Sequence, residues 1–329
     1  MLPYEKAMQD VSIIDKFPGE TNPQYGCAPE NRSYEDLVRY GIVNINKPKG
    51  PTSHQVSEYV KKILHVKKAG QSGTLDPGVT GVLPVGTDRG TRVLRVLLKA
   101  GKEYVCLMHV HDDFGEEHIR KVMHKFVGEI KQLPPIKSAV KRQIRTRKVY
   151  YIDIIEISGR EVLFKVGCQA GTYIRKLCDD IGKALGGGAH MAQLVRTKVG
   201  MFTLGTSVTM QDFSDAIAKK DVSDDYKQYL LPIESAVAHI PKIWVHDSAI
   251  DALCNGSYLA VPGIAKFEST VSDSWVAVLS LKGELIGLGS ALMSAKKITS
   301  AEKGFAVKMD TIIMEIGTYP NWRSNVQKS

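Results

Sequence analysis

The pattern of apolar and polar positions changes along the chain from strand-like to helix-like. Residues 41–45 form an apolar run typical of a buried strand, and residues 47–51 end it because their prolines cannot extend a hydrogen-bonded ladder. Thr52 or Ser53 then stands where a helix cap is expected. In residues 54–64 apolar side chains recur at helical spacing, which predicts an amphipathic helix.

Further elements follow without a regular repeat. Strand-like runs are predicted at residues 81–86, 102–111, 150–158 and 161–171, and helices at residues 91–101, 175–186 and 209–220. Because helices and strands are mixed without strict alternation, the sequence predicts an α+β domain. We expect a mixed, largely antiparallel sheet with flanking helices.

The length of 329 residues and shifts in composition predict more than one domain. Residues 1–39 are polar and rich in turn formers, and we expect them to form an extension that packs on the body at residues 40–235. Residues 274–292 hold two strand-like runs around a Lys-Gly turn, which predicts a β-hairpin. We therefore predict a small, mostly β domain at residues 240–318 and a tail at residues 319–329.

The charge balance favours a polyanionic partner. The chain carries 44 Lys and Arg against 35 Asp and Glu, which gives a net charge of +9 and a pI of about 9.1. This balance fits nucleic acid or a membrane surface. No apolar run approaches the roughly 18 residues of a spanning helix, and the N-terminus lacks an apolar signal core. We expect a soluble, cytoplasmic protein.

Cysteine and histidine usage argues against a metal site. The five cysteines are scattered and contain no CxxC pair, so neither a disulfide framework nor a zinc site is predicted. His109 and His111 would share one strand face beside Asp112 and Asp113, but no third ligand is in place. The glycine run at residues 186–188 lacks the spacing of a phosphate loop.

A carboxylate is displayed on a stiff loop around Asp76. Pro77 pushes Asp76 away from helical dihedral angles, whereas Gly73, Gly78 and Gly81 allow sharp turns and a bulky ligand close to the backbone. These features are compatible with a catalytic nucleophile. From this loop alone, however, an ordinary Asp-Pro-Gly turn is the favoured interpretation.

Two other residues carry candidate chemistry. Arg175 lies between a predicted strand and helix, and an arginine beside a carboxylate favours its ionised form and fixes its direction. The alternative is a surface pair with Asp179 or Asp180 on the same helix. Tyr104 lies on a predicted strand, where its ring could stack on an extruded base and its hydroxyl could move a proton, or could simply pack in the core.

A run of basic residues indicates contact with a nucleic acid backbone. Between residues 137 and 148 the chain has no acidic residue, and each phosphate that it neutralises would make binding more dependent on salt. A solvated run of charge is the alternative, although unmixed sign makes it the weaker one. The basic residues are Lys137, Lys141, Arg142, Arg145, Arg147 and Lys148.

Together these segments resemble the TruB family of pseudouridine synthases, and within it the archaeal and eukaryotic dyskerin branch. The tail is similar to a PUA RNA-binding domain, and the Thr-Asn-Pro-Gln-Tyr-Gly stretch near residue 22 is also similar to the dyskerin branch. The matching family motifs lie at residues 47–54, 72–81, 102–104, 134–142 and 171–177, and those of the tail at residues 256–267 and 303–310.

The resemblance implies a reaction and a set of roles. Asp76 would attack the target nucleotide at either the base or the sugar, so that uracil detaches, rotates and reattaches through carbon 5, without a metal or redox cofactor. Tyr104 would stack on the base and assist proton movement, and Arg175 would pair with Asp76. The motif matches place the following residues at the substrate pocket: Tyr173, Leu194 and His54.

The resemblance also implies partners. As the catalytic subunit of an H/ACA guide-RNA ribonucleoprotein, the chain would assemble with a guide RNA and act on ribosomal or transfer RNA. Three small proteins would join it: a zinc-ribbon protein, a glycine/arginine-type β-barrel protein and a kink-turn-binding protein. The alternatives are a stand-alone tRNA pseudouridine-55 synthase and a non-catalytic RNA-binding scaffold. The chain departs from the family pattern at Gln71, where histidine is usual, and within residues 195–202.

Overall fold

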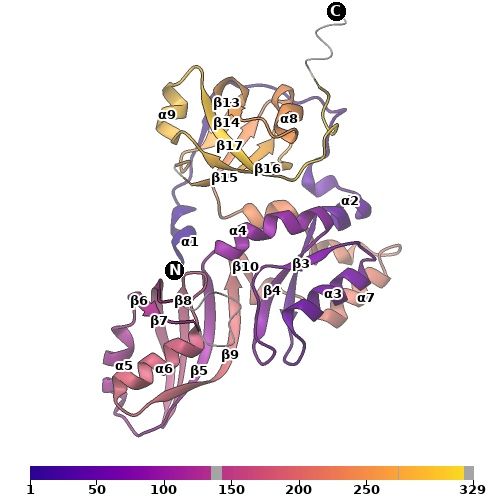
Figure 1. Ribbon diagram of the computed structural model, residues 1–329. Helices are drawn as coiled ribbons and strands as arrows, with labels where there is room; N and C mark the ends of the chain where they lie inside the picture. Colours follow the sequence, from indigo (N-terminus) through magenta and orange to yellow (C-terminus); the bar gives the residue numbers. More distant parts are fainter. Residues whose placement is uncertain (135–142, 273, 322–329) are drawn as a thin grey trace, which may run out of the picture.

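The protein folds around two β-sheets. The computed structural model describes residues 1–134, 143–272 and 274–321. Figure 1 shows the larger sheet and its helices in the lower part of the view, with the smaller sheet, coloured orange to yellow, above them. The indigo N-terminal segment passes from the larger body to the smaller one.

The larger sheet is mixed and mostly antiparallel. Its strands follow the order β11-β2-β4-β9-β5-β8-β7-β6, with β3 added to β4 and β10 to β9. Among the described residues, the named strand pairs of this sheet are antiparallel except β4 with β9. The strands are β2 (Gly41–Lys47), β3 (Ala69–Gln71), β4 (Thr80–Thr87), β5 (Lys102–Val110), β6 (Gly128–Gln132), β7 (Arg145–Ser158), β8 (Glu161–Cys168), β9 (Ala189–Val199), β10 (Phe202–Thr203) and β11 (Leu230–Pro232).

Helices cover this sheet in two groups. One core cluster joins α5 and α6 to strands β5 and β8, and another joins α3 and α7 to β2 and β4. The helices of this body are α2 (Tyr34–Arg39), α3 (Ser53–Ile63), α4 (Leu94–Lys99), α5 (Glu116–His124), α6 (Ile174–Leu185) and α7 (Met210–Ala218), with 3-10 turns at Asp88–Val93, Leu204–Thr206, Asp225–Gln228 and Ile233–Val237. In the described part of the chain, no helix is both long and apolar enough to cross a membrane.

The smaller sheet takes one strand from the N-terminal segment. Its order is β1-β14-β12-β15-β16-β17-β13, and β1 pairs antiparallel with β14. Residues 13–15 are therefore part of the C-terminal domain, whereas Glu5 pairs with Lys198 of β9 in the larger body. The N-terminal segment contains α1 (Pro3–Ala7), β1 (Ile13–Asp15) and a 3-10 turn at Pro29–Asn31. The C-terminal domain contains β12 (Lys242–Val245), α8 (Asp247–Cys254), β13 (Leu259–Ala260), a 3-10 turn at Val261–Gly263, β14 (Ile264–Glu268), β15 (Trp275–Ser280), β16 (Leu285–Ala291), α9 (Ala295–Ser300) and β17 (Phe305–Ile312).

The junction between the two sheets is both apolar and charged. Side chains of α4 and of strands β15 and β16 belong to one buried cluster. Arg89 donates to the Ile313 carbonyl at 2.6 Å, and Lys99 lies 4.0 Å from the Trp275 ring centroid. The buried apolar cluster, the Arg89 hydrogen bond and the cation–aromatic contact together join α4 to the C-terminal domain.

The local predictions hold well. The helix predicted after residue 53 is α3, and Thr52 caps it in a reciprocal box with Gln55. The predicted hairpin is formed by β15 and β16, which pair antiparallel. Gly283 in its turn has a φ of 87°, which glycine adopts without strain. The predicted α+β class with a mixed, largely antiparallel sheet is confirmed.

Candidate active site

The loop that carries Asp76 is anchored by apolar residues on both sides. The side chains of Leu75 and Val79 are buried, at 4% and 5% exposure, whereas the Asp76 side chain is 58% exposed. The Val79 N–H donates to the Asp76 carbonyl at 2.9 Å and closes a turn between them. Burial of its neighbours therefore leaves Asp76 displayed towards solvent on a fixed backbone.

Polar side chains from β2 and α3 hold the same loop. The fully buried Lys47 ammonium donates to the carbonyls of Pro77 (3.3 Å) and Val79 (2.9 Å). The Ser53 hydroxyl accepts from the Leu75 N–H at 2.8 Å and donates to the Leu75 carbonyl at 3.1 Å. Residues 47–54, which match the first family motif, thus fix the backbone around Asp76.

Gln71, a departure from the family pattern, stabilises the start of the Asp76 loop. Its side-chain oxygen accepts from the Gly73 N–H at 2.5 Å, and its side-chain NH₂ donates to the Thr74 hydroxyl at 3.1 Å. Such local bonds from a side chain to the following backbone stabilise turns. Glutamine is therefore compatible with the folded loop at this position.

The three glycines of the loop are not equivalent. Gly73 and Gly81 have φ values of 118° and 105°, where other residues are strained. A Cβ at Gly81 would also lie 2.2 Å from the Arg196 carbonyl oxygen, whereas one at Gly78 would meet nothing within 4 Å. Gly81 is thus needed for the close approach of β4 to β9, and Gly78 lies in open space.

We expect Gly81→Ala to lower the free energy of unfolding by about 3 kcal/mol, because the added methyl group meets backbone and φ is strained. The matched control, Gly78→Ala, should change it by less than about 0.5 kcal/mol. Urea denaturation of both variants measures the difference. Equal stability of the two would show that β4 and β9 do not approach as described.

Arg175 reaches Asp76 from the first turn of α6. Its Nη2 lies 2.6 Å from Asp76 Oδ2, and both side chains are more than half exposed. The alternative partners Asp179 and Asp180 bind Lys176 instead, at 2.7 Å and 2.5 Å. The structure therefore contains the pairing that the family resemblance implies.

Tyr173, just before α6, is positioned by a residue that sequence reasoning missed. The Gln132 side chain is 2% exposed, accepts from the Tyr173 N–H at 3.0 Å and donates to the Tyr173 carbonyl at 3.1 Å. Arg147 donates to the Gly171 carbonyl at 3.2 Å. The oxygen and the nitrogen of the buried Gln132 amide are both paired and fix the backbone at Tyr173. Nothing in the sequence around Gln132 indicates this role.

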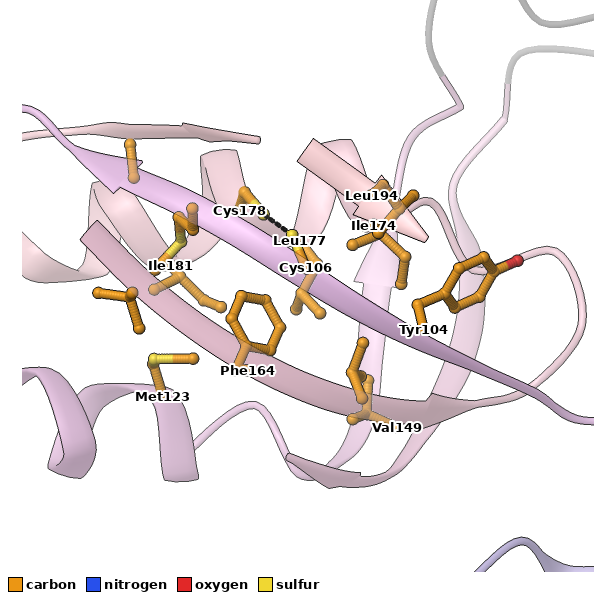
Figure 2. Packing of buried hydrophobic residues seen from close by; sticks show 14 of the residues in the cluster. Tyr104, Cys106, Met123, Val149, Phe164, Ile174, Leu177, Cys178, Ile181 and Leu194 are labelled. Carbon is orange, nitrogen blue, oxygen red and sulfur yellow. Dashed lines mark hydrogen bonds between the residues drawn. The ribbon is translucent and has the colours of Figure 1, made fainter. Parts of the chain in front are cut away.

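Tyr104 and Leu194 lie at the edge of the main core cluster. Figure 2 shows the Tyr104 ring at one end of the cluster with its hydroxyl directed away from it, and Leu194 beside Ile174. Burial raises the pKa of the Tyr104 phenol, and the nearby Arg196 charge lowers it. Tyr104 as a whole is 9% exposed, so the ring is part of the core.

The other two residues of the Lys-Glu-Tyr motif support the fold. Burial, with the nearby Arg196 charge, lowers the pKa of Lys102 to about 7. Its ammonium group donates to the Leu97, Leu98 and Ala100 carbonyls at 2.9 to 3.0 Å, which satisfies the end of α4. Glu103 accepts from the hydroxyl groups of Tyr151 on β7 and Thr197 on β9.

The structure brings the predicted pocket residues into one region. Leu75, Tyr104, Ile174 and Leu194 belong to the same core cluster, and Asp76, Tyr173 and Arg175 are sequence neighbours of its members. His54 is exposed in the first turn of α3, next to Ser53, which bonds the loop. In the described residues its side chain makes no hydrogen bond.

The predicted RNA-binding run is only partly described. Lys137, Lys141 and Arg142 lie outside the described residues. Lys148 is exposed on β7, and Arg145 begins that strand opposite Gln132 of β6. The side chain of Arg147 is bonded to the Gly171 carbonyl, so part of the run holds the protein itself.

A third histidine joins the pair that the sequence placed on one strand face. The rings of His111 and His190 are bonded at 3.0 Å, and His109 contacts Glu161 at 2.6 Å. Sequence reasoning missed His190 because β9 pairs with β5 only in the tertiary structure. Within the described ranges, no group of three or more His, Cys, Asp or Glu residues could hold a metal ion.

Comparison with known proteins covers most of the chain. Family models described as the N-terminal domain of TruB family pseudouridylate synthase, the C-terminal domain of tRNA pseudouridylate synthase B, a PUA domain and a DKCLD domain match residues 61–174, 175–238, 241–313 and 9–57. The probable tRNA pseudouridine synthase B of Methanothermobacter thermautotrophicus is 51% identical over 95% of this chain and 98% of its own. The chain belongs to the TruB family of pseudouridylate synthases.

TruB-family relatives are similar to this chain in both sequence and structure. The probable tRNA pseudouridine synthase B of Pyrococcus abyssi is 50% identical over 94% of each chain. A crystal structure of a Cbf5–Nop10–Gar1 complex matches with a TM-score of 0.91, 47% identity and coverage of 97% of this chain and 98% of that one. An H/ACA RNP bound to a substrate RNA containing 2'-deoxyuridine matches with a TM-score of 0.88, 45% identity and coverage of 95% and 97%.

The resemblance drawn from the motifs is confirmed by these matches. The protein is an RNA pseudouridine synthase, an isomerase with a TruB catalytic domain and a PUA domain.

Proposed function

We propose that this TruB-family enzyme is the catalytic subunit of an H/ACA guide-RNA ribonucleoprotein. The supporting observation is the extent of its likeness to Cbf5 in the Cbf5–Nop10–Gar1 complex, which covers 97% of the chain. Family models also match the N-terminal strand β1 and the PUA domain, which lie outside the catalytic body. The target uridine would be selected by pairing with the guide.

We propose Asp76 as the nucleophile, because it is the carboxylate held next to Arg175 on the anchored loop. Attack at the base or the sugar breaks the bond from the sugar to nitrogen 1 of uracil. The uracil rotates, carbon 5 bonds to the sugar and the bond to Asp76 breaks. The proton on carbon 5 leaves and nitrogen 1, freed from the sugar, gains one. The reaction is an isomerisation, so electrons balance without an oxidant or reductant.

Tyr104 and Arg175 would both serve that step. Arg175 aims the carboxylate through the 2.6 Å ion pair. Tyr104, whose hydroxyl points away from the core cluster, would stack on the base and assist movement of the proton from carbon 5. Tyr173, Leu194 and His54 would line the pocket around the uracil.

Pulling a uridine out of its strand costs a few kcal/mol, and stacking on one aromatic ring returns about 1 to 3 kcal/mol. The remainder must come from contacts with the RNA backbone. The exposed Lys148 on β7, with Arg145 and the basic residues between 137 and 142, would supply such contacts.

The solved complexes suggest which proteins bind this chain. Cbf5 is bound to Nop10 and Gar1 in one of them, and we propose that counterparts of both bind here. The kink-turn-binding partner stays a prediction from the family resemblance.

The second candidate is guide-free modification of transfer RNA. It is favoured by the relatives described as probable tRNA pseudouridine synthase B, which are up to 51% identical. The chemistry would be the same, but the RNA would be recognised by its shape.

Incubating the full-length chain with transfer RNA and with a ribosomal RNA target separates the two candidates. We expect pseudouridine in the ribosomal RNA only with guide RNA and partner proteins, and at a uridine that changes when the guide is exchanged for one of another sequence. Mass spectrometry of digested RNA locates the product. Efficient modification of transfer RNA alone, with no guide-directed product, would establish the second candidate.

A further inference from the structure

Arg196 of β9 is a buried cation at the active site. The residue is 1% exposed and is the largest of the fully buried side chains. Its Nε donates to the Val82 carbonyl at 2.8 Å and its Nη2 to the Gly73 carbonyl at 3.0 Å. None of the ion pairs among the described residues includes it.

The position of Arg196 joins three parts of the site. On β9 it lies opposite Tyr104 of β5 and opposite Gly81 of β4. Through Gly73 its side chain also holds the loop that presents Asp76. One residue therefore connects the strand that carries the tyrosine with both ends of the nucleophile loop.

Tyr104 is the side chain on which the Arg196 charge acts. The two residues are partners in the β5–β9 register, the guanidinium charge favours the ionised phenol, and burial lowers the pKa of Arg196. Burying a cation without a carboxylate is costly, and a well-packed apolar residue would serve stability better. The cost is understandable if the charge acts on a group that takes part in the reaction.

We propose that Arg196 is a positioning residue for the isomerisation. It sets the Asp76 loop and the Tyr104 hydroxyl relative to each other, and it prepares that hydroxyl to move the proton from carbon 5 of uracil. Arg196 itself does not touch the RNA. The inference rests on the roles proposed above for Asp76 and Tyr104.

A double-mutant cycle tests the proposal in the full-length chain, on the RNA that the wild-type protein modifies. Arg196→Lys should lower the single-turnover rate at saturating RNA by about 100-fold and leave RNA affinity within about twofold. With Tyr104→Phe already present, the same substitution should cost less than about fivefold, because the hydroxyl that Arg196 prepares is gone and only its hold on the Asp76 loop remains to be lost. Thermal unfolding identifies variants that fold, and Arg196→Gln is measured beside Arg196→Lys.

Lys47→Met is the matched control, because Lys47 holds the same loop through the Pro77 and Val79 carbonyls but has no interaction with Tyr104 among the described contacts. Its effect on the rate should be the same with Tyr104 and with Phe at that position. A wild-type rate for the folded Arg196 variants, or an equal loss in both backgrounds, would overturn the proposal. Activity of Asp76→Asn would instead overturn the proposed nucleophile.

Discussion

Asp76→Asn is expected to abolish pseudouridine formation, with a single-turnover rate at least about 10⁴-fold below that of the wild-type chain. A carboxamide has the shape of the carboxylate but is not a nucleophile. The fold should persist, because the loop is held by the buried Leu75 and Val79 and by Lys47, none of which contacts the Asp76 carboxylate by hydrogen bond.

The measurement is the yield of pseudouridine by mass spectrometry, together with the affinity for the same RNA and the melting temperature. We expect the affinity to stay within about twofold of the wild-type value, since backbone contacts dominate RNA binding. Product formed by the asparagine variant at a comparable rate would mean that another group is the nucleophile. A lost affinity would instead place Asp76 in RNA binding.

Arg175→Gln is expected to lower the rate by about 100-fold while the free energy of unfolding changes by less than about 1 kcal/mol. The two effects differ because the ion pair with Asp76 is 58% to 60% exposed, so that water screens its contribution to stability. Its contribution to the rate is geometric, because the guanidinium fixes the direction of the carboxylate at 2.6 Å.

The neighbouring Lys176 offers a matched control. It also lies in the first turns of α6, but it pairs with Asp179 and Asp180 on the helix surface. Lys176→Gln should produce the same small change in stability and leave the rate unchanged. If both variants lose activity equally, α6 is disturbed as a whole and the Arg175 pair has no special role.

The anchoring of the nucleophile loop explains why so many motif residues carry no chemistry of their own. Lys47 and Ser53 bond the loop backbone, and Lys102 satisfies the end of α4. An enzyme gains rate from a preorganised site only if the backbone beneath the reacting groups is rigid. In this chain the polar side chains around Asp76 and Tyr104 provide that rigidity.

The local elements were predictable because their causes are local. The cap at Thr52 and the apolar spacing of α3 lie within one short segment, as do the strand runs and the turn of the β15–β16 hairpin. Asp76 itself was a candidate because Pro77 and the surrounding glycines restrict its backbone. Motif order then indicated the family, which the relatives confirmed.

The partners of these residues could not be derived from the pattern. Two alternatives stayed open for Arg175, and only the packing of α6 against the loop selected Asp76, 99 residues away, over Asp179. The roles of Gln132 and His190 could not be predicted, because each residue contacts a strand or loop from a distant segment of the chain.

By itself, then, the sequence determined the secondary structure, the α+β class and the identity of the candidate nucleophile, since periodicity, turn chemistry and motif spacing act along the chain. The tertiary structure decided which charges meet. The register of β5 with β9 places Arg196 against Tyr104, and the docking of α6 places Arg175 against Asp76. Both depend on long-range packing, for which no local stretch of residues contains the information.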